Sequence, residues 1–289
     1  MKQPHLTRRR FLALSGLTLA GTGFYTWRIE PHWIQVVERD LPIIGLPAAL
    51  DGKTLVQLSD LHAGSVDPDY LASAMQRVSD LKPDLTVITG DFMTCHGNEA
   101  IDAAIEVVRH LRPGPLGCFA ILGNHDYALN WRRPDVADQL AKRLAESDIR
   151  VMRNEFVNIA GLQLVGLDDL WATNFHPERV LPKVDWSQPA LTLCHNPDAV
   201  DLPALASIRG WILAGHTHGG QCKPPFLPPP RLPVMNKRYT SGEFDVGNGR
   251  MLYINRGLGH LLRVRFNARP EITVFRLCTI ADAARTRQS

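Results

Sequence analysis

The chain has 289 residues, of which 45% are hydrophobic and 21% charged, a balance typical of a globular protein with a sizeable core. The formal net charge is +3, but Lys2 and the arginines at 8–10 precede residue 11, so the remainder carries −1. This balance gives no indication of a nucleic-acid-binding surface, and we expect no nucleic-acid partner. Five widely spaced cysteines without a CxxC pair argue against a disulfide framework and a thiolate zinc site.

The N-terminus has the layout of an export signal. The stretch TRRRFL at 7–12 places arginines before a short apolar segment, as in signals read by the twin-arginine export machinery. Small residues favour a cut after Ala20. If the signal stays uncut, residues 11–27 are slightly short of the roughly 20 needed to span a membrane, although Tyr25 and Trp27 suit its interface. We therefore expect a protein exported to the periplasm or the outer face of the inner membrane, with membrane-surface attachment through an uncut signal as one alternative and a cytoplasmic protein as the other.

Apolar runs alternate with amphipathic stretches in the first half of the chain. A first strand is predicted within residues 31–43. Further strands at 53–60, 84–91 and 117–126 each precede a predicted helix, at 67–81, 98–111 and 134–147 respectively. This βαβα order predicts a layered α/β fold built from nearly continuous buried strands.

The second half is richer in strands. Short strands are predicted at 162–169, 190–198, 210–219, 250–259 and 271–277, with one helix at 197–207. Six prolines between 224 and 233 exclude helix and central strand from that segment. This Pro-rich loop is either a solvated connection or an apolar lid beside a site, because it follows His218 closely.

Polar side chains stand at the ends of these apolar runs, where open α/β sheets bind ligands. They are Asp60, His62, Asp91, Asn124, His125, His195, His216 and His218. Carboxylates, imidazoles and a carboxamide oxygen suit divalent Mn, Fe or Zn. Even seven ligands from this set are too many for one ion with an open position, and they favour two ions that share a bridging carboxylate.

In this order, the motifs D-x-H, G-D, G-N-H-D, H and G-H-x-H resemble those of the calcineurin-like metallophosphoesterase family. The resemblance spans about Lys53 to Leu277. It implies an α/β fold, a four-layer α/β/β/α sandwich with a di-metal site at the strand ends. It also implies two divalent metal ions as cofactors, Mn, Fe or Zn, and a phosphate-ester substrate.

The resemblance implies a role for each motif residue. Asp60, His62 and His218 would bind one ion, Asn124, His195 and His216 the other, and Asp91 would bridge the two. His125 would stabilise the phosphoryl oxygen and protonate the leaving group. Some family members orient this histidine with an aspartate at the position of Thr94, and Asp126 is the alternative orienting group in this chain.

The stretches VQLSDLHAG, GHTHGGQ, YINRGLG and RFNARPEITV resemble an exported branch of phosphodiesterases grouped with UDP-diacylglucosamine hydrolases of lipid A metabolism. The resulting organisation is an export signal or anchor at 1–27, a strand and lead-in at 28–52, the phosphoesterase domain at 53–278 and a tail at 279–289.

Three functions are weighed. The first is a phosphodiester or pyrophosphate hydrolase acting on a lipid-linked nucleotide, with acyl chains on the Pro-rich loop and Arg231, Lys237 and Arg256 contacting phosphate or sugar. The second is a phosphomonoesterase or nucleotide phosphatase of the envelope. The third, a non-catalytic metal-binding envelope protein, would not require His125.

Overall fold

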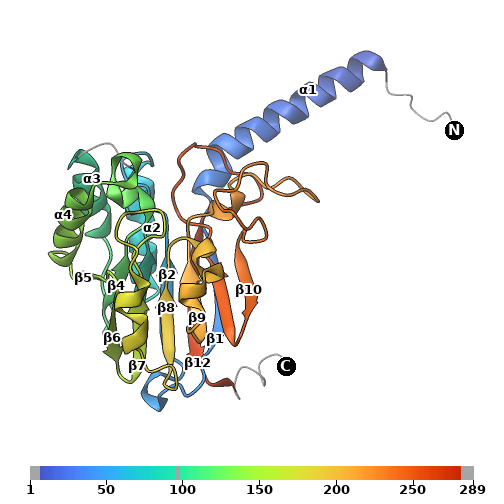
Figure 1. Cartoon of the computed structure of the whole chain (residues 1–289). Coiled ribbons are helices and arrows are strands. Elements are labelled where there is room, and N and C mark those ends of the chain that lie inside the picture. The colour runs from blue at the N-terminus through green and yellow to red at the C-terminus, as the bar shows by residue number, and fades with distance from the viewer. Residues whose placement is uncertain (1–6, 95–97, 281–289) are drawn as a thin grey trace.

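Two six-stranded sheets form the body of the protein, in a computed structural model that describes residues 7–94 and 98–280 (Figure 1). The predicted signal residues before 7 and tail residues after 280 lie outside the described residues. The first sheet runs in the order β1 (Gln35–Pro42), β12 (Glu271–Cys278), β2 (Thr54–Leu58), β3 (Leu85–Thr89), β4 (Cys118–Ile121) and β5 (Ile149–Val151). The second runs in the order β10 (Gly242–Gly247), β11 (Arg250–Ile254), β9 (Gly210–Ala214), β8 (Ala190–Leu193), β7 (Leu162–Gly166) and β6 (Glu155–Ile159).

The central strands of both sheets are parallel. In the first sheet β2 pairs with β3, and β3 with β4, in parallel register. In the second sheet β7, β8, β9 and β11 are likewise successive parallel neighbours. Parallel strands place their carboxyl ends at one edge of a sheet, so the loops that follow these strands gather at that edge.

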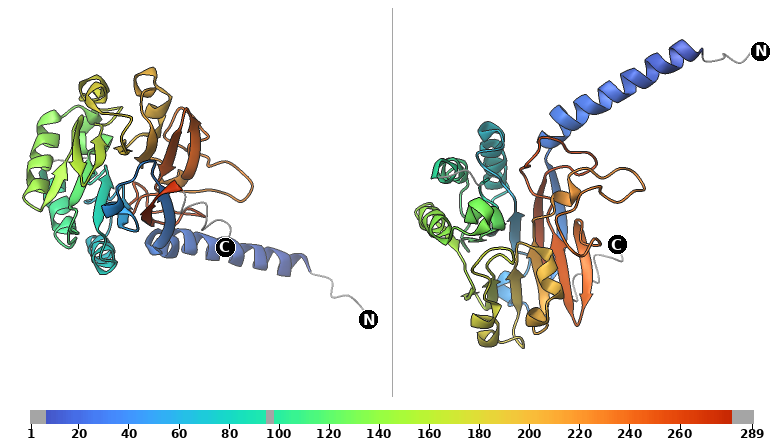
Figure 2. Two further views of the ribbon diagram at one scale, coloured as in Figure 1. Left: turned by 90° about the horizontal axis from the view of Figure 1, so that it is seen from below. Right: turned by 45° about the horizontal axis from the view of Figure 1, so that its top comes forward.

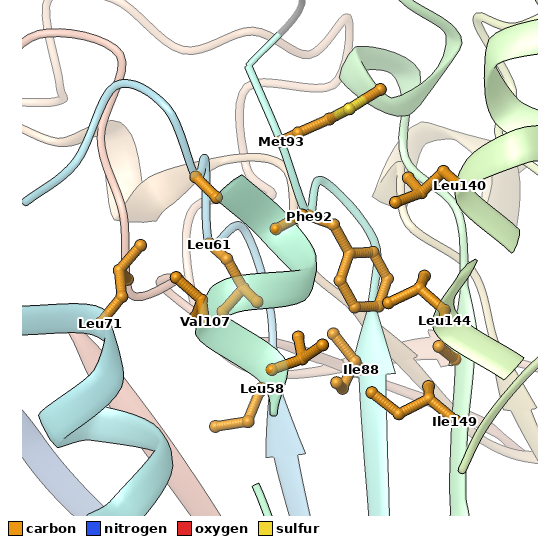
Figure 3. Close-up of a cluster of buried hydrophobic side chains, with 14 of the residues drawn as sticks. Leu58, Leu61, Leu71, Ile88, Phe92, Met93, Val107, Leu140, Leu144 and Ile149 are labelled. Atoms are coloured by element: carbon orange, nitrogen blue, oxygen red, sulfur yellow. The ribbon is translucent and has the colours of Figure 1, made fainter. Parts of the chain in front are cut away.

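Three helices cover the outer face of the first sheet: α2 (Pro68–Asp80), α3 (Asn98–Val108) and α4 (Pro134–Ala145). They lie on one side of the body in both views of Figure 2. Asp67 caps the N-terminus of helix α2, and its carboxylate accepts hydrogen bonds from the N–H groups of Asp69 and Tyr70. Figure 3 shows apolar side chains of the helices, such as Val107 and Leu144, packed on Ile88 of β3.

The two sheets pack face to face, and their inward side chains form a second apolar cluster that includes Leu55, Val87, Leu164 and Leu213. A third cluster lies on the outer face of the second sheet, where Ile212 packs with residues of short 3-10 turns. The predicted layered α/β fold with two facing sheets is confirmed. The outermost layer on the second sheet consists of turns such as Leu181–Lys183 and Pro203–Leu205.

The structure differs from the predicted elements in two respects. The helix predicted at 197–207 is wrong: two 3-10 turns, Pro197–Asp201 and Pro203–Leu205, occupy the segment. Pro203 lacks the N–H needed to continue a helix, and the preceding Leu202 is extended. Strands β5, β6 and β10 were not predicted, because their exposed and half-buried residues give a weak apolar signal.

The helix α1 (Arg8–Phe24) extends away from the body and buries none of its residues (Figures 1 and 2). The chain joins the body directly after it, where the carbonyl of Thr26 accepts a hydrogen bond from the Arg265 N–H at 3.0 Å. Glu30 is buried and accepts from the Ala268 N–H at 2.7 Å. Among the described residues, no helix combines the length and apolar character that crossing a membrane requires.

Candidate metal centre

Seven predicted metal ligands follow the central strands of the two sheets, and all seven are buried. Three strands of the first sheet and two of the second deliver them: Asp60 and His62 after β2, Asp91 after β3, Asn124 after β4, His195 after β8, and His216 and His218 after β9. The site therefore lies where the carboxyl ends of the two sheets meet.

The side chains form two groups of potential ligands. Asp60, His62 and His218 make the first, in which the Nε2 atom of His218 lies 3.0 Å from Nε2 of His62 and 3.3 Å from Oδ1 of Asp60. The second contains Asp91, His195 and His216, with Nε2 of His195 3.2 Å from both Oδ2 of Asp91 and Nδ1 of His216.

Asp91 lies between the two groups. Its Oδ2 is 3.6 Å from Nε2 of His62 in the first group and 3.2 Å from Nε2 of His195 in the second. Its Oδ1 accepts a hydrogen bond from the backbone N–H of His125 at 2.9 Å. One carboxylate oxygen thus faces both groups while the other is held by the protein, an arrangement suited to a bridging ligand.

Hydrogen bonds on the outer side of the site fix which imidazole nitrogen faces inward. His218 and His195 donate from Nδ1 to the carbonyls of Gly259, at 3.3 Å, and Thr89, at 2.6 Å. His216 has the opposite orientation and donates from Nε2 to the Pro233 carbonyl at 2.8 Å. A carbonyl only accepts, so in the neutral form of each ring the inward nitrogen carries a lone pair, which is the form that binds a metal.

The ring of His62 is held differently from the other three. Its Nδ1 lies 3.2 Å from the Thr94 hydroxyl. Thr94 therefore supports the potential ligand His62 and does not orient His125.

The residues present fit divalent cations. Oδ1 of Asn124 is buried and has no hydrogen-bond partner among the described residues, as expected of a ligand atom. In the His216–His195 pair, two inward nitrogens face each other 3.2 Å apart, while the other nitrogen of each ring donates outward. If both rings are neutral, their facing lone pairs repel, so a positive charge between them, a proton or a metal ion, is favoured.

The electrostatics of the site also favour a cation. Burial lowers the pKa of His62 and of His216 to about 3, so both rings are neutral near pH 7. Burial alone would raise the pKa of Asp91, but its attraction to His195 and His125 holds it well below 3.8. At His195, attraction to Asp91 outweighs burial and raises the pKa of the ring well above 6.5. The carboxylates of the site therefore favour a positive charge at this position.

The backbone is unusual at the ligands. Asp60, His62, Asp91, His216 and His218 all have positive φ, between 49° and 72°. This left-handed region is costly for residues with a Cβ and concentrates at functional sites. Gly215 makes the close approach possible, because a Cβ there would collide with the side chains of Ser59 and Asp60.

His125 lies beside the ligands without belonging to either group. Its ring centroid is 5.0 Å from that of His62, and its buried Nδ1 has no hydrogen-bond partner among the described residues. The suggestion that Asp126 orients this ring is wrong. Asp126 accepts from the N–H groups of Gly123, at 2.9 Å, and Met93, at 3.2 Å, and so stabilises the turn instead.

The three basic residues predicted to contact substrate differ in their surroundings. Arg231 is exposed on the Pro-rich loop. Lys237 donates to the carbonyls of Leu232 and Val234, and Arg256 donates to Glu271 and Gln35. The ammonium and guanidinium groups of the latter two therefore already have protein acceptors.

The Pro-rich loop lies against the site. Besides the hydrogen bond from His216 to Pro233, Pro229 packs where a side chain at Gly220 would be. Leu232 and Val234 are buried, whereas Phe226 and Leu227 are exposed. The loop therefore covers the edge of the site and supports a ligand.

Two tryptophans near the site were missed by the sequence analysis. Trp171 contacts His216, with ring centroids 4.5 Å apart, and Trp131 lies 6.4 Å from His125. The position of Trp131 six residues beyond His125 in the chain was the available signal, whereas nothing in the sequence joined Trp171 to the motifs.

Two facing β-sheets with two groups of imidazole and carboxylate ligands at their strand ends are typical of binuclear metallohydrolases, in which two divalent ions activate a water. Residues 53–220 match the model of the calcineurin-like phosphoesterase family. The chain belongs to this family and is a binuclear metallophosphoesterase.

Curated relatives match along almost the whole chain. An uncharacterized metallophosphoesterase, YkuE of Bacillus subtilis, is 33% identical over 94% of this chain and 98% of its own. Phosphodiesterase YaeI of Escherichia coli is 32% identical over 94% of this chain and 99% of its own. The UDP-2,3-diacylglucosamine pyrophosphatase LpxG of Chlamydia muridarum is 28% identical over 92% of this chain and 96% of its own.

Proposed function

We propose that this protein hydrolyses phosphodiester or pyrophosphate bonds with two divalent ions, drawn from Mn, Fe and Zn. Asp60, His62 and His218 would hold one ion, Asn124, His195 and His216 would hold the other, and Asp91 would serve both. The position of Asp91 between the two ligand groups is the observation that carries this assignment.

The two ions supply charge for the phosphate oxygens and lower the pKa of a water toward neutrality, so that a nucleophile exists near pH 7. His125 is the general acid in this proposal, because its ring borders the ligands and no described residue occupies its buried Nδ1. The backbone hydrogen bond from His125 to Asp91 couples the position of the acid to that of the bridge.

Two observations support the substrate class. The relatives named above include a phosphodiesterase and a pyrophosphatase that acts on a UDP-linked, diacylated sugar. The exposed apolar tip of the Pro-rich loop, with Phe226 and Leu227, offers a surface for acyl chains. We infer that the substrate is a lipid-linked nucleotide such as UDP-diacylglucosamine. Of the three predicted basic residues, the exposed Arg231 is the one best placed to contact a phosphate group of the substrate.

A comparison of two chromogenic esters tests the reaction class. We expect bis-p-nitrophenyl phosphate to be hydrolysed with added Mn²⁺ and not after chelation, and at a higher kcat/KM than p-nitrophenyl phosphate. A preference for the monoester would favour an envelope phosphomonoesterase. Turnover of neither ester by metal-loaded protein would count against both functions, and hydrolysis of UDP-diacylglucosamine would then decide between a narrow enzyme and a non-catalytic protein.

Export is part of the proposal and is tested separately. Replacing Arg9 and Arg10 by lysine keeps the charge but removes the arginine pair that the twin-arginine machinery reads. We expect the wild type in the periplasmic or membrane fraction and the variant in the cytoplasm. Equal distribution of the two proteins would contradict a twin-arginine signal.

Membrane-surface attachment rests on exposed apolar side chains near the base of α1. Leu261 and Leu262 are exposed shortly before Arg265, whose N–H donates to Thr26 just after α1. Phe226 and Leu227 are exposed on the Pro-rich loop. We expect the F226S/L227S variant to co-sediment less with phosphatidylglycerol vesicles. The matched control I44S changes an exposed residue that follows β1, at the opposite edge, and should bind as the wild type does.

A further inference from the structure

Two tryptophans from different sheets stack on each other at the mouth of the metal centre. The rings of Trp131 and Trp171 have centroids 5.0 Å apart and planes 22° from parallel. Trp131 follows β4 in the first sheet, whereas Trp171 follows β7 in the second. The pair therefore bridges the loops of the two sheets.

The pair touches both sides of the reaction site. Trp171 meets the ring of His216 edge-on, at 4.5 Å and 86°, and Trp131 lies 6.4 Å from His125. A cavity of about 650 Å³ adjoins the pair and is lined by Asn130, Trp131, Arg132 and Trp171. The indoles therefore border both this cavity and the imidazoles of the metal centre.

The turn that carries Trp131 has a strained backbone conformation. Ala128, Asn130 and Trp131 have φ of 54°, 54° and 59°, and the ψ of −145° at Ala128 belongs to a region used almost only by glycine. Hydrogen bonds from Trp131 N to Ala128 O, at 3.0 Å, and from Arg133 N to Tyr127 O, at 2.9 Å, brace the turn. A strained backbone persists only where surrounding contacts hold it, and such segments are common at ligand-binding sites.

Adjacent carboxylates anchor both tryptophan loops. Asp168 accepts a 2.5 Å hydrogen bond from the hydroxyl of Tyr127, which precedes the strained turn. Asp169 accepts from the backbone N–H of Trp171 at 2.8 Å. Both carboxylates are buried, so two adjacent residues that follow β7 anchor both tryptophan loops.

We propose that Trp131, Trp171 and Arg132 form a subsite for an aromatic ring attached to the reacting phosphate, in biology the base of a nucleoside phosphate. The inference rests on the proposed phosphodiesterase function. Indole faces stack on any nucleobase, and a guanidinium adds a cation–π contact or binds phosphate. The apolar tip of the Pro-rich loop is a separate surface, so the base and an acyl chain would have different binding places.

Three diesters with the same p-nitrophenolate leaving group isolate this subsite: the methyl, phenyl and thymidine 5′ esters of p-nitrophenyl phosphate. The leaving group is constant, so differences in kcat/KM report recognition of the other ester group. We expect the thymidine ester to exceed the methyl ester by roughly 5- to 150-fold, the range that stacking of one base on an aromatic ring supplies, with the phenyl ester between them.

Substitutions assign the preference to the tryptophan pair. W131L should reduce the thymidine-to-methyl ratio of kcat/KM several-fold, whereas W131F, which keeps an aromatic face, should restore most of it. The matched control W186L alters a tryptophan in the loop that precedes β8, at the opposite edge of the sheet, and should keep the wild-type ratio.

The outcomes separate this inference from the proposed function. Hydrolysis of the methyl ester with no gain for thymidine, or an unchanged ratio in W131L, would overturn the subsite while the phosphodiesterase stands. Failure of all three esters with metal-loaded protein would instead count against the proposed function itself. If W131L does not fold, fluorescence of the metal-loaded wild type decides: quenching by thymidine 5′-monophosphate but not by ribose 5-phosphate supports the subsite, and equal responses overturn it.

Discussion

The Pro233 carbonyl accepts a 2.8 Å hydrogen bond from Nε2 of His216, so a loop residue determines that this histidine presents Nδ1 to the metal centre. Lys237 donates to the carbonyls on either side of Pro233, those of Leu232 and Val234. The lysine thereby holds the Pro-rich loop in the conformation that orients His216.

The substitution K237M should weaken metal binding, because it keeps the aliphatic stem and removes both hydrogen bonds to the loop. Loss of outer partners of metal ligands typically costs about 10–100-fold in affinity or activity. We expect metal affinity to fall by about 10-fold or less, because Lys237 acts on the ligand only through Pro233. Metal titration followed by hydrolysis measures it, and K223M, at the start of the same loop, is the control. Equal metal affinity in all three proteins would contradict a positioning role.

The substitution T94V should act on the other ligand group. The Thr94 hydroxyl lies 3.2 Å from Nδ1 of His62, and valine preserves the shape of the side chain without a polar partner. We expect a drop in metal affinity of roughly 10–100-fold, with hydrolysis recovering at high Mn²⁺. Failure of excess metal to restore the rate would mean that Thr94 has another role.

The substitution H125N tests proton donation to the leaving group. We expect kcat to fall by about 10²–10⁴-fold for an alkyl ester, the usual size of a general-acid contribution. The loss should be much smaller for a p-nitrophenyl ester, whose leaving group departs readily without a proton. Elemental analysis should find unchanged metal content. Equal losses for both esters would indicate that His125 does not act as the acid.

His260 gives the folded protein a distinct sensitivity to acid. Its ring is buried, neither ring nitrogen has a partner among the described residues, and burial and then Arg265 lower the pKa of His260 from 6.5 to about 4. The unfolded chain therefore takes up a proton below pH 6.5 that the folded protein does not, and stability is lost as the pH falls from 6.5 to 4.

The substitution H260F should flatten that part of the stability profile. Thermal unfolding of both proteins between pH 4 and 7.5 measures it, and the difference in Tm should shift in favour of the variant as the pH falls. Parallel curves for wild type and variant would show that His260 does not carry the effect.

The sequence predicted where the site residues lie, because apolar runs mark buried strands and polar residues after parallel strands meet at one edge. It did not reveal that His216 presents Nδ1, since this depends on a carbonyl 17 residues further along the chain. Nor did it indicate the positive φ of residues such as Asp60 and Asp91, which tertiary contacts impose.

Contacts between distant segments account for the remaining differences. Asp126 stands next to His125 in sequence, yet its carboxylate turns to the N–H groups of Gly123 and Met93. Trp131 and Trp171 are 40 residues apart and meet only when the two sheets pack together. Local patterns carry no information on such pairings.

The bridging position of Asp91 is the centre of this account, and the D91N substitution tests it most directly. Elemental analysis and hydrolysis of bis-p-nitrophenyl phosphate would be measured on the same samples, with D135N, at an exposed carboxylate, as the control. We predict two ions per chain and metal-dependent hydrolysis in the wild type and control, and loss of at least one ion with nearly all activity in D91N. Retention of both ions and full activity by D91N would contradict a shared bridging carboxylate.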